Sequence, residues 1–145
     1  MTETRDESTR FEEGLLDTNV VLALPKIRDP AALPDRSYIS TITLAELSVG
    51  PLVTDDPVVR AARQAHVQQA EADFDPIPFD ELAARAFGGV AASLRRAGRT
   101  TRARAYDAMI AAIAIANALP LYTANVSDFE EIRGLTVVAV RVPAL

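Results

Sequence analysis

The strongest hydrophobic pattern of the chain lies in residues 102–129, where an apolar helical stretch leads into a short strand-like run. Its apolar positions recur at helical spacing, and the alanines between them allow close packing. These positions are Met109, Ile110, Ile113 and Ala116. Pro120 is expected to end the helix, and residues 121–123 then form a buried strand. The pattern therefore predicts a helix that runs directly into a strand of the core.

The rest of the chain alternates similar strand-like and helix-like stretches. Strands are predicted at residues 14–16, 37–40, 121–123 and 135–142. Helices are predicted at residues 20–24, 43–49, 57–74, 79–96 and from residue 107 to the turn before Pro120. Short, continuously apolar strands interleaved with helices are typical of a mostly parallel sheet that is covered on both faces. The pattern predicts an α/β fold.

Composition supports one folded domain. The chain has 145 residues, 49% of them apolar, which is enough for a buried core and excludes a disordered protein. The longest apolar run, residues 108–116, is far too short to span a membrane. Residues 1–12 are polar and lack a signal-peptide core, so we expect a flexible leader before a domain at residues 13–145. The absence of cysteine fits a cytoplasmic protein.

The charges are distributed unevenly along the chain. A net charge of −5 argues against a general nucleic-acid binder, yet no acid occurs between Glu81 and Asp107. This interval holds the arginines Arg85, Arg95, Arg96, Arg99, Arg102 and Arg104. Such a run is compatible with a solvated helix face, but its position beside a cluster of acids also allows a phosphate-binding arm.

Four acids lie where the predicted strands end or where the helices after them begin. In chain order they are Asp17, Glu46, Asp107 and Asp128. Because the carboxyl ends of parallel strands meet at one edge of a sheet, these four carboxylates would repel each other unless a cation lay among them. Oxygen ligands select Mg²⁺ or Mn²⁺. An ion of this kind suits the hydrolysis of a phosphodiester without a covalent protein intermediate.

Each of these acids also has a purely structural interpretation. Asp17 could cap the following helix through an Asx turn. The sequence Thr43-Leu-Ala-Glu46 fits a capping box, in which the glutamate bonds back to the backbone of the threonine. Asp107 and Asp128 could be helix caps that the helix dipole favours. The occurrence of all four acids at successive strand ends, beside an arginine run, favours the metal site.

Four segments of the sequence together resemble a known family. They are LLDTNVVLAL, STITLAELSVG, YDAMIAAIAIANALPLYTANVSDF and the final TVVAV. In this order they resemble the PIN domains of the VapC type, the toxins of bacterial toxin–antitoxin pairs, from Gly14 to Val142. The resemblance implies a three-layer α/β/α fold and an endoribonuclease that depends on Mg²⁺, with Mn²⁺ as a substitute. It also implies a homodimer and inhibition by a cognate VapB antitoxin.

The resemblance assigns expected roles to individual residues. Asp17 and Asp107 match the acids that would bind the metal directly, and Glu46 and Asp128 would complete the acidic pocket. Asn125 stands where the family has an acid or an amide, and it would orient water or an RNA phosphate. The residues expected to hold the acids by hydrogen bonds are Thr18, Asn19, Thr43, Thr123 and Asn125. The residues expected to bind RNA phosphates are Arg99, Arg102 and Arg104.

Alternative function classes fit less well. A phosphate-accepting receiver domain would need a lysine from a late strand, but the only lysine is Lys26. A haloacid-type phosphatase would need an aspartate at the position of Asn19. A catalytically inactive PIN-like module that binds RNA or protein would be expected to have lost an acid, and this alternative stays open. With three Tyr, five Phe and no Trp, the composition indicates no aromatic platform for RNA.

The expected partners are RNA and an antitoxin. Single-stranded or loop RNA is the expected substrate because its unstacked bases are accessible. Residues 51–53 and 58–59 are apolar and could form a groove for an antitoxin helix, although apolar residues at helical spacing more often pack in a core.

Overall fold

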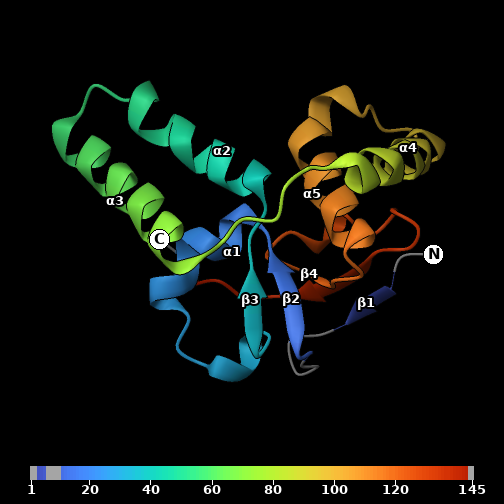
Figure 1. Cartoon of the computed structure of the whole chain (residues 1–145), viewed down its shortest axis with the longest axis horizontal. Helices are drawn as coiled ribbons and strands as arrows, with labels where there is room; N and C mark the ends of the chain where they lie inside the picture. The colour runs from blue at the N-terminus through green and yellow to red at the C-terminus, as the bar shows by residue number, and fades with distance from the viewer. Residues whose placement is uncertain (1–2, 6–10, 144–145) are drawn as a thin grey trace.

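The computed structural model describes residues 3–5 and 11–143, and it contains one five-stranded parallel sheet (Figure 1). The strands are β1 (Glu3–Arg5), β2 (Glu13–Leu16), β3 (Arg36–Tyr38), β4 (Leu121–Thr123) and β5 (Thr136–Ala139). Their order across the sheet is β1-β5-β4-β2-β3, and every pair of neighbours is parallel. The predicted parallel sheet is confirmed, with β1 as an additional edge strand.

Within the residues that the structure describes, five α-helices connect these strands and cover the sheet. They are α1 (Thr18–Ala23), α2 (Thr41–Val49), α3 (Pro57–Asp73), α4 (Glu81–Arg96) and α5 (Ala105–Ala116). Short 3-10 turns lie at Leu24–Lys26, Pro30–Ala32, Gly50–Val53, Arg102–Arg104 and Val126–Asp128. None of the helices in the described part of the chain is long and apolar enough to cross a membrane.

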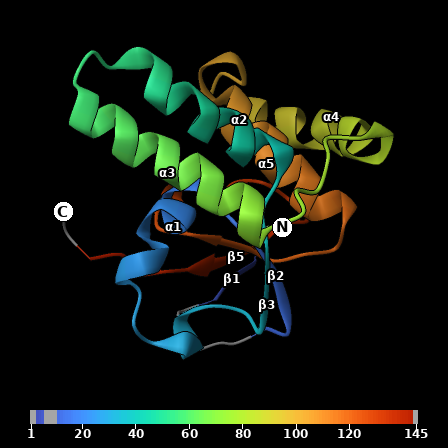
Figure 2. The same ribbon diagram turned by 60° about the vertical axis from the view of Figure 1, so that its left-hand side comes forward.

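Alternate residues of the strands point to opposite faces of the sheet, and this alternation builds two cores. Leu15 and Val137 pack with buried residues of α4 and α5. Leu16 and Val138 pack with buried residues of α1, α2 and α3. Figures 1 and 2 show these two helical groups on either side of the sheet. The three-layer α/β/α architecture is therefore confirmed.

Helices α2 and α4 begin at other residues than predicted, because polar side chains cap α2 earlier and α4 later in the chain. The helix predicted from residue 43 begins at residue 41, since the Ser40 hydroxyl accepts a hydrogen bond from the Thr43 backbone N–H at 3.1 Å. The helix predicted from residue 79 begins at residue 81. There, the Asp80 carboxylate accepts from the Ala83 backbone N–H at 3.0 Å.

The strand predicted at residues 135–142 is shorter in the structure. Only the four residues of β5 are in regular strand conformation, because its partners β1 and β4 are three residues long and offer no longer ladder. Hydrogen bonding continues one residue further, since the Val140 backbone N–H donates to the Thr123 carbonyl at 2.9 Å. The side chains beyond the strand still contribute to the core, as Val140 is buried.

The polar N-terminal segment supplies a strand where the sequence predicts a flexible leader at residues 1–12. Residues 3–5 pair with β5, with Thr4 opposite Val137. An edge strand is held by backbone hydrogen bonds and needs no apolar side chains, so the hydrophobic pattern contains no sign of it. The rest of the leader up to residue 10 lies outside the described residues, and the domain boundary at residue 13 stays a prediction.

Gly14 is required by close packing inside the sheet. A Cβ atom at this position would lie 2.5 Å from Cε1 of the Tyr122 ring and 3.1 Å from Cγ of Pro34. Tyr122 is 1% exposed and Pro34 is buried, so neither has space to move aside. The absence of a side chain at Gly14 therefore lets the aromatic ring of β4 pack across β2.

We expect Gly14→Ala to lower the free energy of unfolding by about 1–3 kcal/mol because the new methyl group overpacks the Tyr122 ring. Gly88→Ala is the matched control, since a Cβ there meets no atom within 4 Å and the residue lies inside α4. The control should raise stability by about 0.5–1 kcal/mol. Urea unfolding of both variants measures these effects, and equal stability of the two would contradict the packing constraint.

Candidate acidic site

The four candidate acids are brought together at the carboxyl edge of the sheet. Asp17 follows β2, Glu46 lies on α2 after β3, Asp107 lies in the first turn of α5, and Asp128 follows β4. Their charges interact, since Asp17 raises the pKa of Asp107, and Glu46 and Asp128 raise that of Asp17. The parallel topology predicted from the sequence therefore places these acids as expected.

Asp17 caps a helix and also belongs to the acid cluster. One carboxylate oxygen, Oδ1, accepts from the Thr18 backbone N–H at 2.9 Å, which caps α1. The other oxygen, Oδ2, accepts from the Thr123 hydroxyl at 2.8 Å. Burial raises the pKa of Asp17, and the hydrogen bonds from Thr123 and Thr18 oppose this increase. The structural and the functional interpretations of Asp17 are therefore compatible.

Glu46 is held by a chain of hydroxyl groups rather than by a capping box. The Thr18 hydroxyl donates to Glu46 Oε1 at 2.8 Å, so the glutamate does not return to the Thr43 backbone. The Thr43 hydroxyl lies 3.0 Å from that of Thr18, and the Ser40 hydroxyl lies 3.5 Å from that of Thr43. Because each hydroxyl has one proton, the chain directs its donors toward Glu46 when the carboxylate is ionised. The capping box predicted for Glu46 is not formed.

Burial also raises the pKa of Glu46, and the charge of Asp107 adds to this increase. The hydrogen bond from Thr18 acts in the opposite direction because it stabilises the ionised form. Ser40 and Thr43 are completely buried. This places Glu46 at the end of a rigid polar connection between α1 and α2.

Asp107 has the largest resolved increase in pKa among the four acids. Burial is the main cause, the charges of Asp17 and Asp128 add to it, and Arg104 opposes it, so the pKa rises from 3.8 to about 6. Asp107 does not cap α5, because Arg104 occupies the cap position and makes no side-chain capping bond. The capping role considered for Asp107 is therefore wrong, and its carboxylate faces the other acids.

The predicted arginine arm is divided between paired and unpaired side chains. Arg104 Nη1 lies 2.9 Å from Asp128 Oδ1, and Arg99 Nε lies 2.9 Å from Glu131 Oε2. Arg102, in contrast, is exposed and has no hydrogen-bond or ion-pair partner among the described residues. Asp128 thus serves as an ion-pair partner for Arg104 rather than as a helix cap.

The two asparagines near the site have different environments. Asn19 Oδ1 accepts from the Ala124 backbone N–H at 3.2 Å, which ties α1 to the turn after β4. The Asn125 backbone N–H donates to the Thr123 hydroxyl at 3.0 Å, while its side chain is exposed. Asp128 interacts electrostatically with Asp17 and Asp107, which favours Asp128 over Asn125 as the fourth acidic group.

An open pocket of about 430 Å³ lies at the mouth of the acid cluster. Its lining residues are Glu46, Arg102, Ala103, Arg104, Ala105, Tyr106 and Asp107. The sequence predicts the acids and arginines of this pocket but not Tyr106, whose position directly before Asp107 is its only signal. Ser40 was also missed, because it precedes the Thr43-to-Glu46 motif and its link to Glu46 passes through two other hydroxyls. The pocket combines carboxylates with cations, as a phosphate-cleaving site requires.

Comparison with protein families matches residues 14–135 to the PIN domain. The chain belongs to the PIN-domain family. It is 39% identical over 129 residues to ribonuclease VapC5 of Mycobacterium tuberculosis, covering 88% of this chain and 93% of the relative. The resemblance inferred from the four sequence segments is therefore confirmed at the level of the family.

Solved structures of toxin–antitoxin complexes share the fold of this PIN domain. VapBC-5 from Mycobacterium tuberculosis matches with a TM-score of 0.75 and 33% identity, covering 89% of this chain and 99% of that chain. The DNA-bound VapBC from Salmonella typhimurium matches with a TM-score of 0.69 and 27% identity, covering 88% and 96%.

The chemistry of this PIN domain's acids fits a hard divalent cation, in line with the general dependence of PIN-domain ribonucleases on divalent metals. The donors are carboxylate oxygens, and burial together with the charges of Asp17 and Asp128 raises the pKa of Asp107, which a bound cation would lower. In residues 3–5 and 11–143, no group of three or more Asp, Glu, His or Cys side chains is arranged so that it could hold a metal ion as the side chains stand. Asp17, Glu46 and Asp128 accept hydrogen bonds from threonines and Arg104, and each carboxylate keeps further lone pairs that remain available to an ion.

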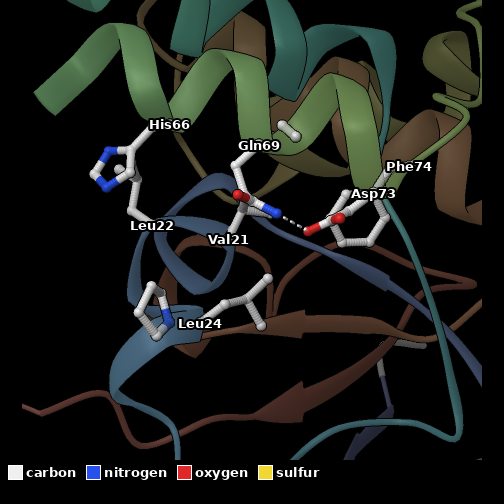
Figure 3. A pocket seen from close by; sticks show the side chains of 9 residues that line it. Val21, Leu22, Leu24, His66, Gln69, Asp73 and Phe74 are labelled. Carbon is white, nitrogen blue, oxygen red and sulfur yellow. Dashed lines mark hydrogen bonds between the residues drawn. The ribbon is translucent and has the colours of Figure 1, made fainter. Parts of the chain in front are cut away.

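A second pocket of the PIN domain has a different character. It measures about 350 Å³ and lies between α1 and α3, where Val21, Leu22 and Phe74 form part of its wall (Figure 3). Its acid, Asp73, accepts a hydrogen bond from Gln69 at 2.7 Å, as the dashed line in Figure 3 marks. None of the four candidate acids lines this pocket.

We expect Asp107→Asn to remove a pH-dependent loss of stability from the metal-free protein. The pKa of Asp107 is raised from 3.8 to about 6 in the folded protein. The stabilising contribution of its protonated form is therefore fully present below pH 3.8. This stabilisation is lost as the pH rises through about 6. The variant should therefore gain about 1–2 kcal/mol relative to the wild type between about pH 4 and about pH 7.

Urea unfolding at several pH values in the presence of EDTA measures this difference. Asp55→Asn is the control, because Asp55 is exposed and lies on the loop before α3. This control shows the effect of removing one exposed carboxylate outside the acid cluster. A stability difference for Asp107→Asn that does not vary with pH would contradict the raised pKa of Asp107.

Proposed function

We propose that this PIN-domain protein is an endoribonuclease toxin that uses Mg²⁺, with Mn²⁺ able to substitute, and that a VapB-type antitoxin inhibits it. The observation that carries the proposal is the group of four partly or fully buried acids at one edge of the sheet, where burial and the charges of Asp17 and Asp128 raise the pKa of Asp107. A fold maintains such a group at a cost in stability, which indicates a functional cation. The name of the ribonuclease relative supports RNA as the substrate.

In this proposal, Asp17 and Asp107 hold the ion, and Glu46 and Asp128 complete the negative pocket. When bound, a divalent ion supplies an activated water and neutralises charge that develops on the phosphate. The Thr123 and Thr18 hydroxyls hold the carboxylates of Asp17 and Glu46 in place by hydrogen bonds. These hydrogen bonds stabilise the ionised carboxylates, which is the form that a cation needs.

The three arginines of the site differ in the ion pairs that they make before an RNA phosphate binds. Arg102 is available to an RNA phosphate without breaking an ion pair. Arg104 would bind a phosphate while it keeps Asp128, since one guanidinium can bridge both groups. Arg99 lies farther along the arm and would contact a neighbouring phosphate after leaving Glu131. The three side chains thus extend the positive surface away from the acids.

Asp17→Asn and Asp107→Asn should each reduce Mg²⁺-dependent cleavage of a mixed RNA pool by at least about a hundredfold, because each removes a charge from the metal site. Asparagine retains an N-cap oxygen at position 17, so α1 should still form. Cleavage by the purified chain is measured with Mg²⁺, Mn²⁺ or EDTA, and circular dichroism checks the fold. Asp55→Asn should cut like the wild type.

The two possible outcomes separate the two function classes. Metal-dependent cutting that only the site variants lose supports the nuclease. A well-folded wild type that cuts no RNA with either metal, or site variants that cut at the wild-type rate, would establish a non-catalytic binding module instead.

An exposed apolar surface supports the antitoxin as a partner. Leu52 is 84% exposed, Val53 68% and Val58 78%, all around the junction of α2 and α3. Beside them, a pocket of about 540 Å³ is lined in part by Pro51, Leu52 and Pro57. We propose that an apolar segment of the antitoxin covers this surface, and that the toxin itself forms a homodimer.

Leu52→Asp and Val58→Asp should abolish copurification with the coexpressed cognate antitoxin, because each places a charge in a surface that the antitoxin covers. Leu82→Asp is the control, since Leu82 is 58% exposed but lies on α4. Pull-down and light scattering measure antitoxin binding and mass. Variants that retain the antitoxin but become monomeric would assign the surface to the homodimer instead.

A further inference from the structure

Tyr106 is an aromatic side chain that the fold leaves in solvent. It is 53% exposed, and it is the one exposed residue among the three Tyr and five Phe, all of which lie in the described part of the chain. Neither hydrophobic core includes it. Its phenol group has no hydrogen-bond partner in residues 3–5 and 11–143, whereas the hydroxyl of Tyr38 donates to Glu13 at 2.6 Å. Packing and hydrogen bonding therefore do not account for this tyrosine.

Tyr106 lies beside the unpaired arginine of the site. Tyr106 and Arg102 line the same open pocket as Glu46 and Asp107. Of the three arginines at the end of the arm, Arg102 is the one with no acid partner among the described residues, since Arg99 pairs with Glu131 and Arg104 with Asp128. An available cation and an available aromatic ring thus occur together at the mouth of the acid cluster.

The pocket has the dimensions and the walls for one nucleotide. Its volume of about 430 Å³ lies within the usual range for small-molecule sites. The alanines Ala103 and Ala105 line it between the larger side chains and leave the tyrosine ring accessible. A nucleobase can stack on an aromatic ring while its phosphate meets a guanidinium, and this combination binds unpaired nucleotides without a strong base preference.

We propose that Tyr106 and Arg102 form a subsite for one unpaired RNA nucleotide next to the cleavage position, with the base stacked on the tyrosine ring and the phosphate held by the arginine. The inference rests on the proposed ribonuclease function and adds a requirement for the substrate. A base that is stacked within a duplex cannot reach the ring, so one nucleotide that flanks the cut must be unpaired. The subsite tolerates different bases because each has a π-face.

The test measures cleavage of a fluorescent single-stranded oligoribonucleotide with a mapped cut site, in Mg²⁺. Tyr106→Ala should raise KM by about tenfold, in the range expected for the loss of one base–aromatic stack. Tyr106→Phe should behave like the wild type because the ring remains. Arg102→Ala should raise KM and weaken its dependence on salt. Leu82→Ala, an exposed apolar truncation on α4, should leave KM unchanged.

Substrates with a single abasic nucleotide identify the stacked base. At one position beside the cut, loss of the base should raise KM for the wild type about as much as Tyr106→Ala does, and it should have no further effect on that variant. Two results would overturn the subsite: a wild-type KM for Tyr106→Ala, or abasic effects that add fully to the effect of the variant.

Binding measurements separate this inference from the proposed function. Failure of the ribonuclease proposal is seen as a wild type that cuts no RNA. Fluorescence anisotropy with the same oligoribonucleotide decides the subsite in either case, with Asp17→Asn as the background that suppresses cleavage. Addition of Tyr106→Ala to this background should weaken the Kd about tenfold. An unchanged Kd would overturn the subsite whether or not the wild type cuts.

Discussion

Repulsion among carboxylates is the constraint around which this PIN domain is built. Parallel strands end at one edge, and the acids that follow them must share a small, poorly solvated space. The burial that raises the pKa of Asp107 to about 6 is produced by the same packing that forms the two cores. The threonine hydroxyls and Arg104 offset part of this unfavourable energy. The acid cluster therefore lowers the free energy of unfolding, and the packing of the sheet and helices must compensate for this loss.

The sequence predicted four strands of the sheet and the five α-helices of the described residues because their hydrophobic patterns are unambiguous. The apolar residues before Pro120 and the short runs around β2 and β4 each identify a buried element. Strand β1 could not be predicted, since backbone pairing with β5 holds this polar segment. The starts of α2 and α4 were each displaced by two residues because Ser40 and Asp80, rather than the expected residues, provide the caps.

The acids of the site could be predicted, but their partners could not. Strand order is enough to bring Asp17 and Asp107 to the same edge. Which donor holds which carboxylate depends on side-chain rotamers and on distances across elements far apart in sequence. The bond from Thr18 to Glu46 spans 28 positions, and that from Thr123 to Asp17 spans 106. The pairing of two arginines and the exposure of Tyr106 likewise arise only from the folded chain.

The double role of Asp17 affects how divergent members of the family are interpreted. Its carboxylate caps α1 through the Thr18 N–H, so a chain without nuclease activity would still favour Asp, Asn, Ser or Thr at this position. No hydrogen bond of the described fold requires an acid at Asp107, where the charge opposes folding. A relative that no longer cleaves RNA would gain stability by replacing this residue. An aspartate that survives at position 17 is therefore weak evidence of activity, whereas one that survives at position 107 is strong evidence.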